Sequence, residues 1–430
     1  MAAQPQAKLS LADGVYIGVG SMIGAGLFAA FAPAAAAAGP WLLLSLALAA
    51  FLALANATSS AQLAAQHPES GGTYIYGSRQ LGHAWGFAAG WCFVIGKTAS
   101  CAAMAMTFAA YLAPGYEKPL AIAAVLALTI VNCRGITRTA ALTKILVTLV
   151  LLALTVFFGA VLLGVAPAPA LTRPNAGAGA GTSGGLFQTA YGVMQGAGLL
   201  FFAFAGYARI ATMGSELQNP AVNIPKAITI ALTFVTALYL FVAVALVHQL
   251  GYANLAQAPA PLAAAVGSSP ALAALMGVAA ALAALGALLA LITGIGRTGH
   301  AMATHRDLPG FFAALHPVYA VPARIDITVA GAVIALILFF DVRGAIGFSS
   351  FGVLLYYLIA NMAAYTQTGS YRRYPSWLQV AGVIGCALVV TTLPAESITG
   401  GLVLLGVGLV VYLTYARRIP QESGQASSGE

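Results

Sequence analysis

The sequence offers few side chains for chemistry, and one of them lies where a charge is costly. Lys97 stands in the run GWCFVIGKTASCAAMAM, near the centre of a long apolar segment. Because a charge at membrane depth is expensive, a lysine there predicts a functional group that faces the protein interior. One such role is to load and release a proton. The alternative is a lysine that bonds to backbone carbonyls as a packing element.

Two apolar segments are interrupted by glycine. The first, GVYIGVGSMIGAGLFAAF, holds five glycines in thirteen residues: Gly14, Gly18, Gly20, Gly24 and Gly26. The second, GAGLLFFAFAGYARIATMGSE, has Gly206 and Tyr207 after an aromatic run. Small-residue helix packing is one interpretation of the first string, and a dinucleotide loop is disfavoured because no strand precedes it. Glycine disfavours a continuous helix by about 1 kcal/mol per residue, so we expect unwound backbone at residues 21–26, lining a cavity.

Other chemistries lack the side chains that they need. A membrane enzyme would require converging carboxylates, histidines or metal ligands at membrane depth, but Asp13, Asp326, Asp341 and Glu396 lie at the ends of apolar runs. The cysteines form no CxxC pair, so neither a metal site, a disulfide nor any cofactor is predicted. A channel would need repeated polar rings. Five histidines are expected to lie in solvated loops: His67, His83, His300, His305 and His316.

Composition indicates the elements that must position these groups. The 430 residues are 60% hydrophobic and 7% charged, with a mean hydropathy of +0.91, which excludes a soluble globular protein. A span needs about 20 apolar residues, so the chain predicts an all-α polytopic membrane protein with twelve transmembrane helices. We place them at residues 14–37, 41–65, 82–112, 119–133, 139–164, 188–214, 226–249, 270–303, 324–341, 344–366, 376–394 and 397–416.

The basic residues predict the orientation of these spans. The net charge of +8 comes from cations placed singly or in pairs at span ends, which argues against nucleic-acid binding and for membrane orientation. With a cytoplasmic N-terminus, residues 1–13, the inside loops hold 14 cations: Lys8, Arg79, Arg134, Arg138, Lys144, Arg209, Lys226, Arg297, Arg306, Arg324, Arg372, Arg373, Arg417 and Arg418. The outside loops hold Lys118, Arg173 and Arg343. Both termini are therefore predicted to be cytoplasmic, with a Pro/Gly/Ala-rich outer loop at 165–187 and a polar cytoplasmic tail at 417–430.

The two interrupted spans occupy corresponding positions in two sets of five helices. The first set covers residues 14–164 and the second covers 188–366, and five is odd, so the second set enters the membrane from the opposite side. Discontinuous helices at matching positions of inverted repeats indicate a substrate site at the membrane midplane. The predicted architecture is a 5+5 inverted repeat with broken helices 1 and 6, followed by two C-terminal helices in residues 367–416.

Several stretches, in order, give the chain a family resemblance. They are GVGSMIGAGLF, HPESGGTYIYG, NCRGITRTAAL, FFAFAGYARIATMGSELQNPAVNIPKAI and RTGHAMATHRDLPGFFAALHP, between about residues 10 and 416. With these motifs the chain resembles the amino acid permeases of the amino acid/polyamine/organocation (APC) superfamily. The resemblance implies secondary active transport by alternating access, with an amino acid or amine as the small-molecule substrate, in the lipid bilayer of the cytoplasmic membrane.

The resemblance also implies positions for the binding site. The amides of Gly24, Ala25 and Gly26 would hold a substrate carboxylate, as half-helix N-termini do. The substrate amine would meet backbone carbonyls that are freed where the two helices break: Met22 or Ile23 in helix 1, and Phe202, Ala203 and Ala205 in helix 6. Tyr207 stands where the family often has an aromatic gate; the alternative is a packing or interfacial tyrosine.

Two departures from the family pattern bear on coupling and gating. Some proton-coupled members carry a lysine midway along helix 5, where this chain has only apolar residues, with Lys144 at the cytoplasmic end. Lys97 is the replacement that we predict for the coupling group. The glutamate that many members have at the end of helix 2 is also missing, which points to Glu69, Arg79 and Glu216 for the cytoplasmic gate.

The substrate is expected to be a neutral amino acid, coupled to protons. No Asp or Glu lies near the middle of spans 1, 3, 6, 8 or 10, whereas a carrier of cations would be expected to offer one. A cationic amino acid or polyamine transporter or antiporter is the alternative, and a non-transporting receptor or scaffold is a more remote one.

Overall fold

A computed structural model describes residues 8–69, 71–135, 140–165, 185–214 and 216–415. Most of the predicted outer loop, the tail from residue 416 onward, and Arg138, Arg173, Arg417 and Arg418 lie outside this part of the chain. Within it, helices form throughout and no strand does, apart from an isolated bridge between Leu9 and Leu217. The all-helical prediction is confirmed for these residues.

The helices follow the predicted apolar runs. They are α1 (Leu11–Met22), α2 (Ala25–Ala29), α3 (Phe31–Ala38), η1 (Gly39–Trp41), α4 (Leu42–Gln66), α5 (Thr73–Leu81), α6 (His83–Leu112), α7 (Glu117–Cys133), α8 (Ala140–Leu162), α9 (Leu186–Phe204), η2 (Ala205–Tyr207), α10 (Ala208–Ala211), α11 (Pro220–Gln257), α12 (Pro261–Ala265), α13 (Pro270–Thr304), η3 (Gly310–Ala313), α14 (Ala323–Phe339), α15 (Val342–Tyr365), η4 (Gly369–Tyr371), α16 (Ser376–Thr392) and α17 (Ala395–Thr414).

Among the described residues, nine helical stretches are long and apolar enough to cross a membrane. Three more helices, α7, α14 and α16, have 17 residues each and lie where spans 119–133, 324–341 and 376–394 were predicted. Seventeen residues is the lower limit for a span, at a rise of about 1.5 Å per residue. The chain is therefore a polytopic helical protein, and the count of twelve spans and the inverted repeat stay predictions.

Both glycine-interrupted segments deviate from continuous α-helix. The first span divides at Ile23 and Gly24, within the predicted break at residues 21–26, and Gly24 takes a ψ of −139° that no helix contains. The sixth segment tightens into the 3₁₀ turn η2 directly after Phe204. These two interruptions pack against each other near the centre of the bundle.

The helix of the sixth segment ends at Ala211, and two prolines lie in the first two turns of the next helix. Pro220 begins α11 and Pro225 lies inside it. Proline suits a first helical turn, since the N–H that it lacks would be unbonded there. The Ala221 carbonyl, which the missing N–H of Pro225 leaves without its usual helical donor, accepts a hydrogen bond from Arg373 at 3.3 Å.

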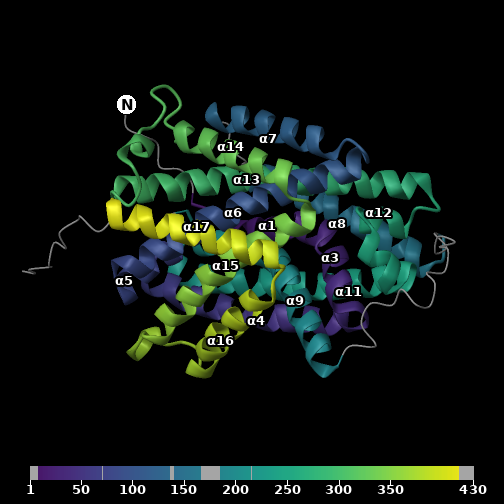
Figure 1. Ribbon diagram of the computed structural model, residues 1–430, viewed down its shortest axis with the longest axis horizontal. Coiled ribbons are helices and arrows are strands. Elements are labelled where there is room, and N and C mark those ends of the chain that lie inside the picture. The colour runs from purple at the N-terminus through teal and green to yellow at the C-terminus, as the bar shows by residue number, and fades with distance from the viewer. Residues whose placement is uncertain (1–7, 70, 136–139, 166–184, 215, 416–430) are drawn as a thin grey trace, which may run out of the picture.

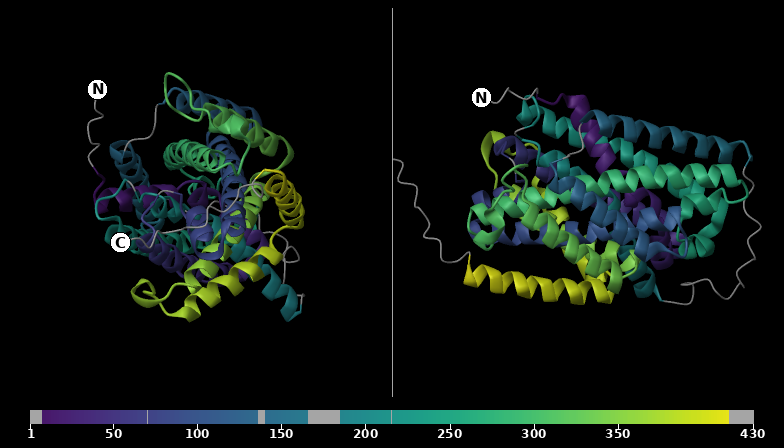
Figure 2. Two further views of the ribbon diagram at one scale, coloured as in Figure 1. Left: turned by 90° about the vertical axis from the view of Figure 1, so that its left-hand side faces the viewer. Right: turned by 90° about the horizontal axis from the view of Figure 1, so that it is seen from above.

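The helices run largely along one direction, as the three views show (Figures 1 and 2). Figure 1 shows α7, α14 and α13 layered along one edge, and α6 packs beneath α13. The yellow helix α17 lies along an outer edge in the right-hand view of Figure 2 and buries only Ser397, Gly401 and Gly408. An ion pair of 2.6 Å between Lys144 and Asp13 joins α8 to α1. This packing holds the two interruptions in the interior.

Candidate functional site

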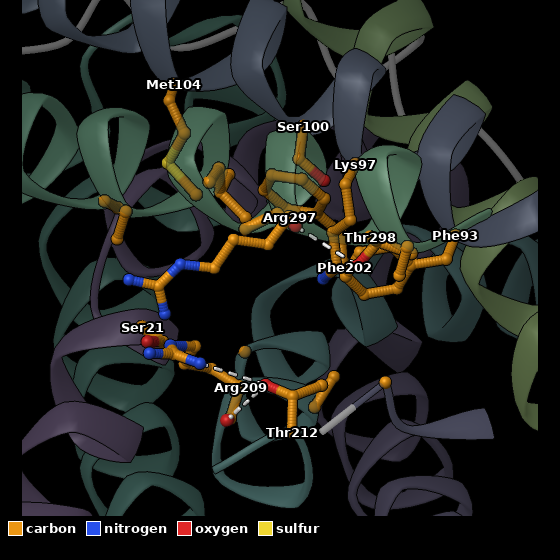
Figure 3. Close-up of a pocket in the computed structure, with 18 of the residues that line it drawn as sticks. Ser21, Phe93, Lys97, Ser100, Met104, Phe202, Arg209, Thr212, Arg297 and Thr298 are labelled. Atoms are coloured by element: carbon orange, nitrogen blue, oxygen red, sulfur yellow. Dashed lines mark hydrogen bonds between the residues drawn. The ribbon is translucent and has the colours of Figure 1, made fainter. Parts of the chain in front are cut away.

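A cavity of about 350 Å³ lies beside the two interruptions (Figure 3). Helix α6 contributes Phe93, Lys97, Ser100 and Met104 to its wall, and α13 contributes small residues, with Arg297 and Thr298 after them. The remaining lining comes from Ser21, Gly71, Phe202, Gly206, Ala208, Arg209, Thr212 and Glu216. The space is enclosed mainly by apolar groups, with its charged side chains on two sides.

Glycines let the two interrupted helices touch. A methyl group added at Gly26 would overlap the Cα atom of Ala203, and one added at Gly206 would overlap the Ser21 carbonyl. Any larger side chain at either position would push the backbones apart. Small-residue packing was one interpretation of the first glycine string, and the contact of Gly26 with Ala203 is of that kind.

A thioether sulfur accepts a hydrogen bond from one of the amides predicted to bind a carboxylate. The Ala25 N–H donates to Sδ of Met104 at 3.0 Å. At Gly24, an added Cβ would lie 2.8 Å from the same sulfur and 2.8 Å from Cβ of Ala287. Since a thioether is a weak acceptor, a carboxylate would bind this amide more strongly than Met104 does. The sequence gave no signal for Met104, because a methionine in an apolar run is typical of core packing.

Three of the carbonyls predicted to hold an amine already accept hydrogen bonds from side chains, and a fourth, that of Phe202, accepts from the Ala205 backbone N–H. The Tyr239 hydroxyl of α11 lies 2.6 Å from the Met22 oxygen and 3.0 Å from the Ala203 oxygen, so it links the two interruptions. The ammonium of Lys97 donates to the Ala205 oxygen at 3.1 Å. Tyr239 was missed because a tyrosine within an apolar run reads as packing.

Lys97 is buried, with 5% of its surface exposed, and it faces the cavity. Among the described residues no carboxylate lies within ion-pair distance of its ammonium. The contact with Ala205 is the carbonyl bond that the packing alternative expected. It also connects α6 to the interruption of the sixth segment, and the coupling role stays a prediction.

The three residues predicted for the cytoplasmic gate fall into two separate groups of ion pairs. Arg79 and Glu69 meet at 3.1 Å with both side chains more than half exposed. Glu216 instead bonds at 3.2 Å to both Arg209 and Arg297 on the cavity wall. In Figure 3 the two arginine side chains approach each other on one side of the cavity, and Lys97 lies on another side beside Phe93.

Tyr207 does not line the cavity. It is fully buried, and its ring stacks on that of Tyr357 with 5.1 Å between the centroids. The structure therefore places it as the packing alternative expected, and a gating movement of Tyr207 stays a prediction.

Two carboxylates are buried. Asp326 lies in the first turn of α14, at the end of an apolar run as predicted, and only 1% of its surface is exposed, because α7 and α13 cover it. Asp307 is fully buried and bonds at 2.7 Å to both His83 and the Tyr74 hydroxyl. His83 is therefore not the solvated loop histidine that the sequence suggested.

The geometry combines a buried cavity, interrupted helices and an apolar exterior, and similarity to known proteins agrees with it. The family model described as amino acid permease matches residues 9–415, nearly the whole described chain. The chain belongs to the amino acid permease family, within the APC superfamily. It is accordingly a transporter and a multi-pass membrane protein that moves a small molecule.

Individual relatives differ in what their names say. An uncharacterized transporter of Mycobacterium tuberculosis is 49% identical over 425 residues, covering 98% of this chain and 94% of the relative. The branched-chain amino acid permease BcaP of Bacillus subtilis is 25% identical, covering 96% of this chain and 93% of its own. The chloroplastic cationic amino acid transporter 7 of Arabidopsis thaliana is 27% identical, covering 81% of this chain and 63% of its own length.

Proposed function

We propose that this permease carries neutral amino acids across the cytoplasmic membrane by alternating access, with both termini in the cytoplasm. The observation that carries the proposal is the cavity beside two interrupted helices, where the Ala25 N–H and the Ala205 carbonyl are hydrogen-bonded to Met104 and Lys97, two side chains of the cavity wall. An amino acid carries one carboxylate and one ammonium group, so it matches donors and acceptors that lie a few ångströms apart. The proposed architecture keeps twelve spans, with repeats at 14–164 and 188–366.

The substrate carboxylate binds the amides of Gly24, Ala25 and Gly26 in this proposal. It displaces Sδ of Met104 from the Ala25 amide, and the charged acceptor replaces a weak one. The substrate ammonium binds carbonyls of the interruptions, and Ala205 is the one that already accepts from a cation. The side chain projects toward the small residues of α13.

The charges on the cavity wall favour a neutral side chain. Lys97, Arg209 and Arg297 are cationic, and the carboxylate of Glu216 is already bonded to both arginines. A second cationic group on the substrate would meet like charges and find no free carboxylate, which is costly in a dry site. The name of the branched-chain permease relative fits this class.

Cationic amino acids are the second candidate. The Arabidopsis relative is named for them, and backbone carbonyls can serve a cation where no carboxylate is free. A receptor or scaffold of the same fold is the third candidate, and a transport measurement excludes or supports it directly.

The cavity reaches Arg209, Arg297 and Glu216, which the topology prediction assigns to the cytoplasmic side. We therefore propose that this conformation faces the cytoplasm. Protons are the proposed coupling ion, and Lys97 is the proposed coupling group inside the cavity.

Counterflow in proteoliposomes tests the proposal. Vesicles loaded with unlabelled leucine and holding the purified permease are diluted into labelled leucine. A carrier exchanges the two and accumulates label transiently without any ion gradient, whereas a receptor or scaffold does not. Gly331→Ala serves as the active control, because the added methyl group meets open space on α14. Absence of exchange with every neutral, cationic and acidic amino acid and with putrescine would contradict transport.

A further inference from the structure

Asp326 is a buried carboxylate that the proposed substrate site does not use. It lies in the first turn of α14, and 1% of its surface is exposed. The Asn132 amide of α7 donates to Oδ2 at 2.8 Å, and Oδ1 is buried with no hydrogen-bond partner among the described residues. An ionised carboxylate with a dry, unbonded oxygen is strongly disfavoured. This environment fits the neutral acid.

The unbonded oxygen presses against a helix that forms the cavity wall. A methyl group added at Gly296 of α13 would overlap Oδ1, so the oxygen lies directly on that backbone. The other carboxylate oxygen is linked to α13 through Asn132, whose own oxygen accepts from Thr293 at 2.7 Å. Arg297, the next residue after Gly296, lines the cavity. Asp326 thus lies behind the wall that the cavity presents to substrate.

Among the described residues, no cation forms an ion pair with Asp326. On α7 the neighbouring ionisable group is the thiol of Cys133. The ionisable side chains on the facing half of α13 are Arg297, which bonds Glu216, and His300 one turn further on. Two further elements pack on α14: α6, whose Lys97 bonds Ala205, and η3, which has no ionisable side chain.

We propose that Asp326 is a proton-binding site that controls the position of α13. The neutral acid stabilises the packing seen here. Loss of the proton places a charge against the Gly296 backbone, so the ionised form favours a conformation in which α13 has moved and this cavity is closed. Proton binding and the conformational equilibrium are then linked. The proposal rests on the proposed alternating access, but its test needs no substrate.

A cysteine on the cavity wall reports the conformation. Ala290→Cys places a thiol on α13 inside the cavity, and its labelling by a water-soluble maleimide is measured from about pH 5 to about pH 8, below the usual titration range of lysine. The same protein without the reporter gives the background from native thiols. At each pH, the labelling rate of the Asp326→Asn protein is divided by that of the protein with native Asp326. This ratio removes the pH dependence of the maleimide reaction itself, which requires the thiolate.

The expected ratio is about one at the acid end and several-fold at the alkaline end, because only the native carboxyl can ionise and close the cavity. Asp307→Asn is the matched control, since Asp307 is equally buried but has both oxygens bonded; it should follow the native curve. A ratio that stays near one at every pH overturns the proposal. All histidines remain in these proteins, so a conformational change caused by a histidine would alter both labelling rates equally and leave the ratio near one.

A second variant keeps the proposal testable if Asp326→Asn does not fold. Asn132→Ala removes the amide that donates to Oδ2, and this bond favours the ionised form. The midpoint of the labelling curve should therefore move to higher pH by about one unit, the usual net value of a hydrogen bond to a charged group. An unmoved midpoint contradicts the proposal. Loss of counterflow with an intact labelling curve would count against the proposed function alone.

Discussion

Gly26 makes the strictest demand on residue size in the candidate site. Its Cα faces Ala203 so closely that a single added methyl group overlaps the backbone of the other interruption. We expect Gly26→Ala to lower the free energy of unfolding by about 1–3 kcal/mol and to reduce counterflow strongly, because the two interruptions separate. Gly24→Leu, whose side chain would overlap Met104 and Ala287 and block the approach of a carboxylate to the amides of the first interruption, should abolish uptake while membrane insertion stays intact.

Thermal unfolding and counterflow of the purified variants check this expectation, and Gly331→Ala is the control with open space at its Cβ. Normal exchange by Gly24→Leu would remove the amides of the first interruption from the substrate site.

Single residues could be predicted from the sequence where their type conflicted with their surroundings. Lys97 stands out as a charge in an apolar run, and the structure confirms that it is buried beside the cavity. Asp326 did not stand out, because it lies three residues into an apolar run and is covered only by α7 and α13, which are distant in sequence. Met104 and Tyr239 are ordinary membrane residues, so only their contacts distinguish them.

Among the elements, Lys97 connects α6 to η2. Its side chain donates to the Ala205 carbonyl at 3.1 Å, and the charged ammonium makes this bond more strongly than the neutral amine does. We expect Lys97→Ala vesicles to lose accumulation of substrate in response to an imposed pH gradient and to retain counterflow, which needs no gradient. Lys118→Ala is the matched control, since Lys118 is exposed at the start of α7. Gradient-driven accumulation by Lys97→Ala would show that the coupling group lies elsewhere.

The interruptions of the helices were predictable because glycine acts locally. The first span divides at Ile23 and Gly24, inside the predicted segment, and η2 begins directly before Gly206. The effect of Pro225 and the partners of Glu216 depend on distant chain segments: Arg373 bonds the carbonyl that Pro225 frees, and Arg297 reaches Glu216 from α13. Patterns along the sequence contain no such information.

At the scale of the whole molecule, the cations serve two purposes. Arg209 and Arg297 were predicted to be loop charges that orient the spans, and the structure places both on the cavity wall. Composition predicts a polytopic helical protein because every residue contributes to hydropathy. It does not predict the cavity, whose wall is assembled from α6, α13 and both interruptions, and whose charge decides the proposed substrate class.

Competition in the counterflow assay tests the central claim most directly, because it compares the binding of neutral and cationic side chains at the same site. Labelled leucine is exchanged in the presence of a fixed excess of unlabelled alanine, leucine, methionine, lysine, arginine or putrescine. The cationic wall predicts that the three neutral amino acids suppress labelled uptake and that lysine, arginine and putrescine leave it nearly unchanged. Stronger suppression by the cationic compounds would contradict the neutral-substrate account.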